Sequence, residues 1–261
     1  MYAFEFVKPA TLADAVAALA GDDAQPLSGG QTLLPSMKQR LNAPATLVSL
    51  TGIAEMKGVS AAGGVLTIGA ATPHAQVAAQ AGAYPALAAL AGQIGDPAVR
   101  NRGTIGGSLA NNDPSACYPS AVLASGATLV TNIREIAADD YFRGMFTTAL
   151  EPGEILTAVR FPIPQKAAYA KFQQPASRFA LTGAFVAKYP GGVRVAITGA
   201  SEGGVFRWAE AEAALSRSFT PEAVKGLKLS ADGMIGDLHG TPDYRAHLCA
   251  VMTARAVAAA G

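Results

Sequence analysis

Two glycine pairs in the first half of the chain constrain its fold and its chemistry more than any other feature. They lie in two short polar stretches, Ser28-Gly29-Gly30-Gln31-Thr32 and Thr104-Ile105-Gly106-Gly107-Ser108. A backbone without Cβ atoms lets main-chain N–H groups come close to an anion such as a diphosphate. Two such turns, far apart in the sequence, predict one long anionic cofactor held between two lobes.

A glycine pair alone is not specific, because the chain contains five of them. The pairs at 63–64, 191–192 and 203–204 each precede a valine-led apolar stretch and are typical of hairpin or loop-to-strand turns. The pairs at 29–30 and 106–107 have polar neighbours on both sides, so the residues support phosphate binding and a plain turn equally. Neither follows the Rossmann or the Walker pattern, which disfavours a nicotinamide fold or an NTPase.

Composition and charge exclude several classes of protein. The chain has 261 residues, half of them apolar, and a formal net charge of +1, so we expect no binding to nucleic acid. Cys117 and Cys249 are too few for a disulfide framework and lack metal-ligand spacing, so we expect no metal site on this chain. The sequence shows neither a signal peptide nor a membrane-spanning segment, and we expect a cytoplasmic protein.

The local patterns predict a mixture of helices and strands. A capping-box pattern at Thr11 predicts a helix to Ala20, and Thr-Pro pairs at 72–73, 220–221 and 241–242 predict further helix starts, the last for a helix running to the end of the chain. Stretches rich in valine, isoleucine and threonine predict strands. These cover residues 46–50, 65–68, 127–131, 155–161, 182–189 and 193–198.

The order of these elements predicts an α+β fold in two parts. Helices and strands mix up to about residue 163, and a strand-rich stretch followed by helices comes after it. Between them, Pro162 and Pro164 block both a helix and a central strand. We therefore expect one domain over residues 1–163 and another over residues 164–261.

Two long motifs resemble one known family. The motifs are Ser28-Gly29-Gly30-Gln31-Thr32-Leu33-Leu34-Pro35-Ser36-Met37-Lys38 and Ile94-Gly95-Asp96-Pro97-Ala98-Val99-Arg100-Asn101-Arg102-Gly103-Thr104-Ile105-Gly106-Gly107-Ser108-Leu109-Ala110-Asn111-Asn112-Asp113-Pro114. They are similar to signatures of the FAD-binding medium subunit of molybdenum hydroxylases, such as aerobic carbon-monoxide dehydrogenase and xanthine dehydrogenase. The similarity continues through 145–155, 172–180 and 243–248. It implies a FAD-binding domain of the vanillyl-alcohol-oxidase (PCMH) type, with lobes of about 1–56 and 57–163, and then a smaller α+β flavoprotein domain with an antiparallel sheet.

The resemblance also implies where non-covalent FAD binds. The two turns would surround its pyrophosphate, and Gly30 and Gly106 are the positions where added side chains should do most harm. Ile94 and Gly95 would approach the isoalloxazine, Leu156 the adenine, and Cys117 stands where many relatives carry an acid that contacts the ribose. Lys171 and Phe179 would face the flavin, although ordinary strand packing explains them as well. The turn residues are Leu27, Ser28, Gly29, Gly30, Gln31, Thr32, Leu33, Thr104, Ile105, Gly106, Gly107 and Ser108.

We expect the remaining candidate side chains to have structural or surface roles and no role in catalysis. None of His74, His239 and His247 adjoins a glycine turn in the sequence, so we expect surface or core roles for them and no histidyl-FAD bond. Arg100 and Arg102 are interpreted as solvated charges and Asp113 as a loop cap. The sequence shows no nucleophile–base pair and no metal cluster, so we assign no catalytic residue and expect the chemistry to belong to the flavin.

The resemblance implies an oxidoreductase subunit that transfers electrons. A large molybdenum-containing subunit would oxidise the substrate, and the [2Fe-2S] clusters of a small subunit would carry electrons to FAD, which passes them to a quinone, NAD or oxygen. The molybdenum cofactor and the clusters would lie on these partners, in a dimer of heterotrimers. Two alternatives stay open: a free-standing flavin oxidase of the same fold, and a flavin-free scaffold subunit, for which the departure at Cys117 is the only hint.

Overall fold

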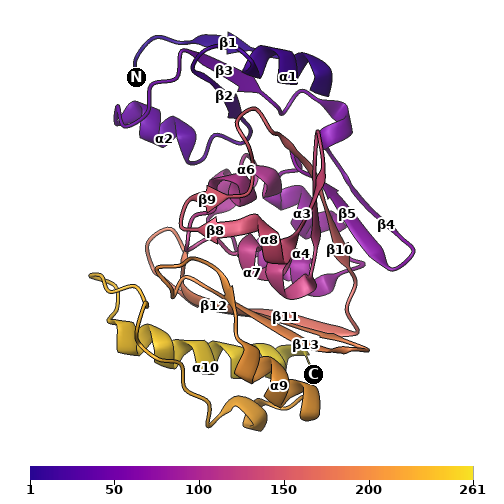
Figure 1. Ribbon diagram of the computed structural model, residues 1–261, viewed down its shortest axis with the longest axis vertical. Coiled ribbons are helices and arrows are strands. Elements are labelled where there is room, and N and C mark those ends of the chain that lie inside the picture. Colours follow the sequence, from indigo (N-terminus) through magenta and orange to yellow (C-terminus); the bar gives the residue numbers. More distant parts are fainter. Residues whose placement is uncertain (261) are drawn as a thin grey trace.

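The computed structural model describes residues 1–260, which form an α+β fold with three main sheets (Figure 1). The N-terminal sheet has three parallel strands in the order β1-β3-β2, drawn in indigo and violet at the top of Figure 1. Leu27, Met37 and Leu47 form a small core beneath it. The elements of this part are β1 (Glu5–Val7), α1 (Leu12–Leu19), β2 (Ala24–Leu27), α2 (Leu33–Lys38) and β3 (Thr46–Ser49).

The middle of the molecule is built on a five-stranded antiparallel sheet in the order β4-β5-β10-β6-β7. Short helices pack beside it, and a two-stranded hairpin, β8–β9, follows the last of them (Figure 1). The elements are η1 (Ala54–Met56), β4 (Val59–Ala62), β5 (Val65–Gly69), α3 (His74–Gln80), α4 (Pro85–Gly92), α5 (Pro97–Arg100), α6 (Ile105–Asn111), α7 (Tyr118–Ser125), β6 (Thr128–Thr131), β7 (Glu135–Ala137), α8 (Ala138–Tyr141), β8 (Phe142–Gly144), β9 (Thr147–Thr148) and β10 (Leu156–Pro162).

The last part is a four-stranded antiparallel sheet covered on both faces. Helices α4 and α7 of the middle part contact one face, and α9 and α10 contact the other. Strand β12 is therefore buried at every residue from Ala180 to Ala187, which explains its nearly continuous apolar sequence. The elements are β11 (Lys166–Gln173), β12 (Ala180–Tyr189), β13 (Gly192–Thr198), β14 (Phe206–Arg207), α9 (Ala209–Arg217), η2 (Pro221–Val224) and α10 (Pro242–Ala260).

The α+β class and all six predicted strands are confirmed, with strand ends moved by one or two residues. The division at residue 163 stays a prediction, because the four-stranded sheet shares its core residues with both neighbours. Phe185 and Ala196 pack into the core of the middle part, whereas Ala184 and Ile197 pack against α9 and α10.

A helix or 3-10 helix begins at, or one residue after, each of the four predicted starts, but the threonine makes a capping hydrogen bond in only two cases. The Oγ1 atoms of Thr11 and Thr241 accept main-chain N–H groups at the starts of α1 and α10. Thr72 does not cap α3, because its hydroxyl hydrogen-bonds the main chain of Gly58 instead. Thr220 precedes only the short η2 and makes no capping bond.

A buried arginine fixes α10 beneath the four-stranded sheet. The Arg245 guanidinium donates to the carbonyl oxygens of Leu181 and Gly199, each at 2.7 Å, and to both carboxylate oxygens of Asp237. Burial works against ionisation of Asp237, but the hydrogen bonds from Arg245 and from main-chain N–H groups outweigh it and lower the pKa of this carboxyl. The ion pair therefore keeps the buried cation compensated.

Asp237→Asn should leave the Arg245 charge uncompensated and lower the free energy of unfolding by about 2 kcal/mol, less than for a fully buried pair because the carboxylate is partly exposed. Urea unfolding of the chain measures this loss. Asp22→Asn, at an exposed site, is the control and should change stability by less than about 0.5 kcal/mol. Equal stability of the two variants would contradict the role of the pair.

Candidate cofactor-binding cavity

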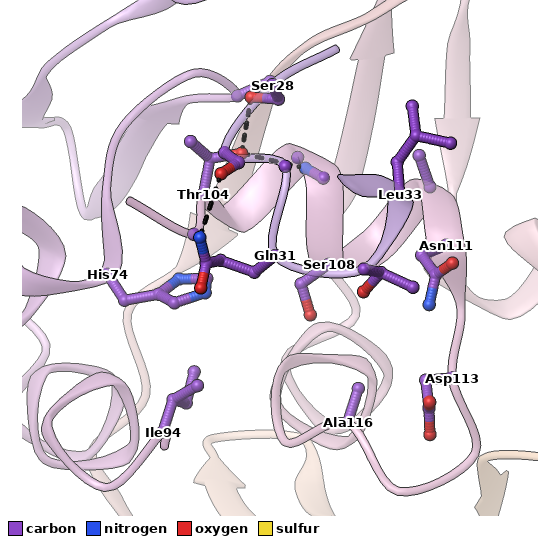
Figure 2. Close-up of a pocket in the computed structure, with 18 of the residues that line it drawn as sticks. Ser28, Gln31, Leu33, His74, Ile94, Thr104, Ser108, Asn111, Asp113 and Ala116 are labelled. Atoms are coloured by element: carbon purple, nitrogen blue, oxygen red, sulfur yellow. Dashed lines mark hydrogen bonds between the residues drawn. The ribbon is translucent and has the colours of Figure 1, made fainter. Parts of the chain in front are cut away.

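The two glycine turns meet at one cavity of about 890 Å³, which lies between the N-terminal lobe, the helices of the middle part and the segment after β11. This volume is within the range that holds a drug-sized or cofactor-sized ligand. Ser28 Oγ and Thr104 Oγ1 lie 2.7 Å apart and hydrogen-bond each other, so a direct contact joins the turns (Figure 2). The turns are thus neighbours in space although 76 residues separate these two hydroxyls.

All residues expected to contact the cofactor line this cavity except Ile105. The Ile105 side chain is completely buried in the core, and its N–H donates to the Thr72 carbonyl oxygen. Leu156, Lys171 and Phe179 come from distant segments and still reach the same cavity, as does Cys117. The structure therefore brings the predicted set together, while the contact of each residue with a cofactor stays a prediction.

The first turn has unoccupied main-chain donors. The N–H groups of Gly29, Gly30, Gln31, Thr32 and Leu33 have no acceptor among residues 1–260. Gly30 has φ +69°, and a Cβ on Gly29 would lie 2.1 Å from the Arg102 carbonyl oxygen, so this turn packs directly on the backbone before the second turn. A run of free N–H groups in a cavity wall fits an anionic group such as a diphosphate.

The second turn differs from the expectation. The N–H groups of its last four residues already donate within the chain: Ile105 to Thr72 O, Gly106 to Ala70 O, Gly107 to Thr104 Oγ1 and Ser108 to Thr104 O. These four amides are therefore not free for a diphosphate. This turn offers the cavity its small residues and the Ser108 hydroxyl, and the prediction that both turns supply free amides was wrong for the second one.

Different neighbours limit the space for a side chain at each glycine of the two turns. A Cβ on Gly106 would lie 2.5 Å from the Ala70 Cβ and 2.7 Å from the Ala70 carbonyl oxygen, so this glycine allows close packing against the end of β5. An added side chain there would meet protein before it met a ligand. The space at Gly29 is smaller still, whereas a Cβ on Gly107 would lie 3.0 Å from Thr104 Oγ1 and 3.6 Å from Ser28 Cβ.

Arg100 and Lys171 fix two further segments of the cavity wall through hydrogen bonds to main-chain carbonyl oxygens. Arg100 Nη1 donates to the carbonyl oxygens of Ile94 (3.1 Å) and Gly95 (2.9 Å), so it positions this segment and is not merely a solvated charge. Lys171 Nζ donates to the carbonyl oxygens of Gln93 and Arg178 at 2.8 and 2.7 Å and lies 3.7 Å from Cys117 Sγ. Lys171 thereby ties β11 to the middle part at the edge of the cavity.

Sequence reasoning missed His74, which also lines the cavity. Although His74 adjoins neither glycine turn in the sequence, its main-chain N–H donates to Gly103 O (2.9 Å), one residue before the second turn. Burial, with a smaller effect of Arg100, lowers the pKa of His74 to about 4. No local sequence signal predicts a contact between segments so far apart. His239 instead contacts the Phe179 ring, and Asp113 caps its loop by accepting the Ser115 N–H.

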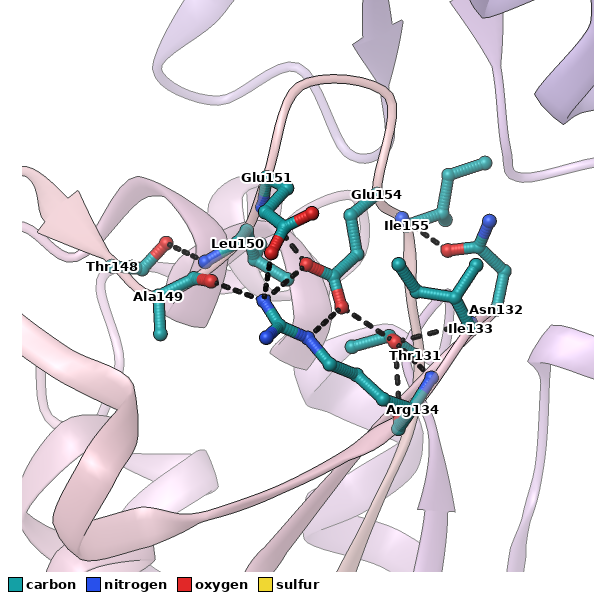
Figure 3. A network of polar contacts seen from close by, with 10 residues as sticks. All are labelled: Thr131, Asn132, Ile133, Arg134, Thr148, Ala149, Leu150, Glu151, Glu154 and Ile155. Atoms are coloured by element: carbon teal, nitrogen blue, oxygen red, sulfur yellow. Dashed lines mark hydrogen bonds and ion pairs between the residues drawn. The ribbon is translucent and has the colours of Figure 1, made fainter.

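A carboxylate network supports the segment that runs from β9 to β10 along the cavity (Figure 3). Glu154 accepts hydrogen bonds from the Arg134 guanidinium at 2.9 Å, from the Thr131 hydroxyl at 2.7 Å and from the Glu151 N–H at 2.8 Å. The Arg134 hydrogen bonds are the main cause that lowers the pKa of Glu154 to about 2, against the effect of burial. Glu154 and its neighbours Leu150, Ile155 and Leu156 all line the cavity.

Over residues 1–260, no group of three or more His, Cys, Asp or Glu side chains is placed to hold a metal ion. Both cysteines are free and buried. Within the same residues, none of the helices combines the length and apolar character that crossing a membrane requires.

Gly106→Ala should lower the free energy of unfolding by about 2 kcal/mol, because the new methyl group overlaps the Ala70 backbone. Gly107→Ala should change the free energy of unfolding by less than about 1 kcal/mol, since its methyl group meets side-chain atoms of Thr104 and Ser28 and no backbone, and alanine has the higher helix propensity. Thermal unfolding followed by circular dichroism measures both, with Gly82→Ala, where nothing lies within 4 Å, as the control. A Gly106→Ala variant as stable as this control would refute the packing argument.

Glu154→Gln should destabilise the chain by roughly 3 kcal/mol at pH 7, from the shift of its pKa from about 4.5 to about 2. Because the folded-state pKa is depressed, the stabilisation is present above pH 4.5 and is lost as the pH falls toward 2. Unfolding in urea between pH 7 and pH 2 should show a weaker pH dependence in the variant. Glu210→Gln, at an exposed site, is the matched control and should keep the original dependence.

Comparisons with known proteins place this chain in a family of FAD-binding proteins. Residues 2–164 match the family model described as the FAD binding domain in molybdopterin dehydrogenase. The carbon monoxide dehydrogenase medium chain of Afipia carboxidovorans is 35% identical, covering 97% of this chain and 95% of that protein. The nicotine 6-hydroxylase medium subunit of Paenarthrobacter nicotinovorans is 32% identical, covering 99% of this chain and 98% of that protein.

A solved structure shows the same fold. A chain of reconstituted CO dehydrogenase from Oligotropha carboxidovorans has a TM-score of 0.91 and 32% sequence identity to this chain, with 99% of this chain and 98% of that chain covered. The similarity extends over both parts of the molecule, and the family resemblance noted from the glycine motifs is confirmed. The chain therefore belongs to the family of FAD-binding domains of molybdopterin dehydrogenases, which are oxidoreductases.

Proposed function

We propose that this chain is the FAD-binding electron-transfer subunit of a molybdenum hydroxylase complex. The observation that carries the proposal is the single cavity in which the first turn presents free N–H groups and the Ser28–Thr104 hydrogen bond holds the second turn beside it. These residues fit FAD, whose diphosphate needs donors without bulky side chains. Bound FAD supplies the redox chemistry, and the protein supplies binding and orientation.

Each wall of the cavity has a role in this proposal. The N–H groups of residues 29–33 hold the diphosphate without a covalent bond to the cofactor. Arg100 keeps the backbone of Ile94 and Gly95 in place beside the flavin. Lys171 brings a positive charge to the cavity, where no carboxylate of residues 1–260 forms an ion pair with it, and this charge favours a reduced, anionic ring.

The names of the relatives, which describe them as a medium chain or a medium subunit, support an assembly of several different subunits. We infer a large molybdenum-containing subunit and a small subunit with [2Fe-2S] clusters, in a dimer of heterotrimers. Electrons pass from these clusters to FAD and then to an external acceptor such as a quinone, NAD or oxygen. The molybdenum cofactor and the clusters belong to the partner subunits. A cytoplasmic location is part of the same proposal.

The purified chain should show the flavin absorption bands in the visible spectrum, or gain them when FAD is added. Under anaerobic conditions, an organic substrate should bleach these bands only when the molybdenum and [2Fe-2S] subunits are present. Omission of each partner in turn is the control, and photoreduction of the isolated chain shows that its flavin is competent.

Two other results would each support a different function. Bleaching by a substrate in the isolated chain would identify a free-standing flavin oxidase. A colourless chain that binds no added FAD would identify a scaffold subunit.

A further inference from the structure

One wall of the cavity contains a histidine without a hydrogen-bond partner on its side chain. His74 is 4% exposed and lines the cavity from the first position of α3. Its Nδ1 atom is enclosed by protein and has no partner, and Nε2, which is not enclosed, has none among residues 1–260. Because Nδ1 is enclosed, Nε2 is the ring nitrogen through which this buried side chain can hydrogen-bond a ligand in the cavity.

The surroundings of the ring hold it in this orientation. The main-chain bond to Gly103 O fixes the start of α3, and the Tyr118 ring packs against the imidazole with centroids 5.3 Å apart. Gly103 leaves room for the ring, since a Cβ there would lie 2.6 Å from Nε2. Figure 2 shows the imidazole directed from the wall toward the interior of the cavity.

The charge state of the ring selects the chemistry of the partner. With a pKa of about 4, His74 is neutral at physiological pH. A neutral imidazole has one donor and one acceptor, so it suits an uncharged heterocycle better than a phosphate. The anion site is accounted for by the free N–H groups of residues 29–33, and Ile94 and Gly95 give the cavity an apolar wall.

We propose that Nε2 of His74 hydrogen-bonds the isoalloxazine ring of bound FAD, whose polar edge carries an N–H donor and several oxygen and nitrogen acceptors. The proposal rests on the proposed function and deepens it. It makes His74 a binding residue for the flavin half of the cofactor. The ADP half does not contact it.

The test compares two ligands with variants of the flavin-stripped full chain. His74→Phe keeps a ring of similar shape without a polar atom, so the dissociation constant for FAD should rise about three- to tenfold while that for ADP stays unchanged. His74→Gln places an amide near the position of Nε2 and should restore most of the FAD affinity. His74→Asn places its amide near Nδ1 and should behave like the phenylalanine variant.

Tyr118→Phe is the matched control, because its hydroxyl is also buried without a partner but does not line the cavity. It should leave both dissociation constants unchanged. The proposal is overturned if FAD binding by a folded His74→Phe or His74→Asn variant is unchanged, or if FAD and ADP weaken equally. An unmodified chain that bound ADP and FAD equally well would also overturn it. A chain that bound neither would refute the proposed function itself, and this proposal with it.

Discussion

The close contact between two backbone turns is the constraint on which the whole cavity depends. Gly29 lies so near the Arg102 carbonyl oxygen that any side chain would separate the turns, and the Ser28–Thr104 hydrogen bond closes the contact beside it. The N–H groups of residues 29–33 have no acceptor within the described part of the chain, so they are available to a ligand. The N-terminal lobe therefore contributes donors, and the middle part contributes the surface against which they are held.

Much of the fold follows from local sequence patterns, but not all of it. Strands rich in valine, isoleucine and threonine, such as β5 and β13, were predicted because side-chain shape alone favours an extended backbone. Strand β11 was missed because its alanines and lysines have low strand propensity, and its pairing with β12 determines its conformation. The short strands β1 and β2 depend in the same way on β3, which lies between them.

The residues of the site could also be predicted where they form a continuous motif, but not where they depend on contacts between distant segments. Nearly every residue that was predicted from the glycine motifs and the family resemblance lines the cavity, because each motif is continuous in sequence. The state of their N–H groups could not be predicted, since it depends on Ala70 and Thr72, some 35 residues before the second turn. The positions of Arg100 and His74 escaped for a related reason: both residues donate to main-chain carbonyl oxygens, and such contacts leave no pattern in the sequence.

The position of Lys171 has a consequence for the independence of the two halves of the chain. The family model ends at residue 164, yet Lys171 and Phe179 line the same cavity, and Lys171 reaches back to the backbone of Gln93. Residues 2–164 therefore do not enclose the cavity by themselves, and replacing the C-terminal part would remove some of its lining residues. A new C-terminal part would have to bring its own lysine and aromatic residue to complete the enclosure.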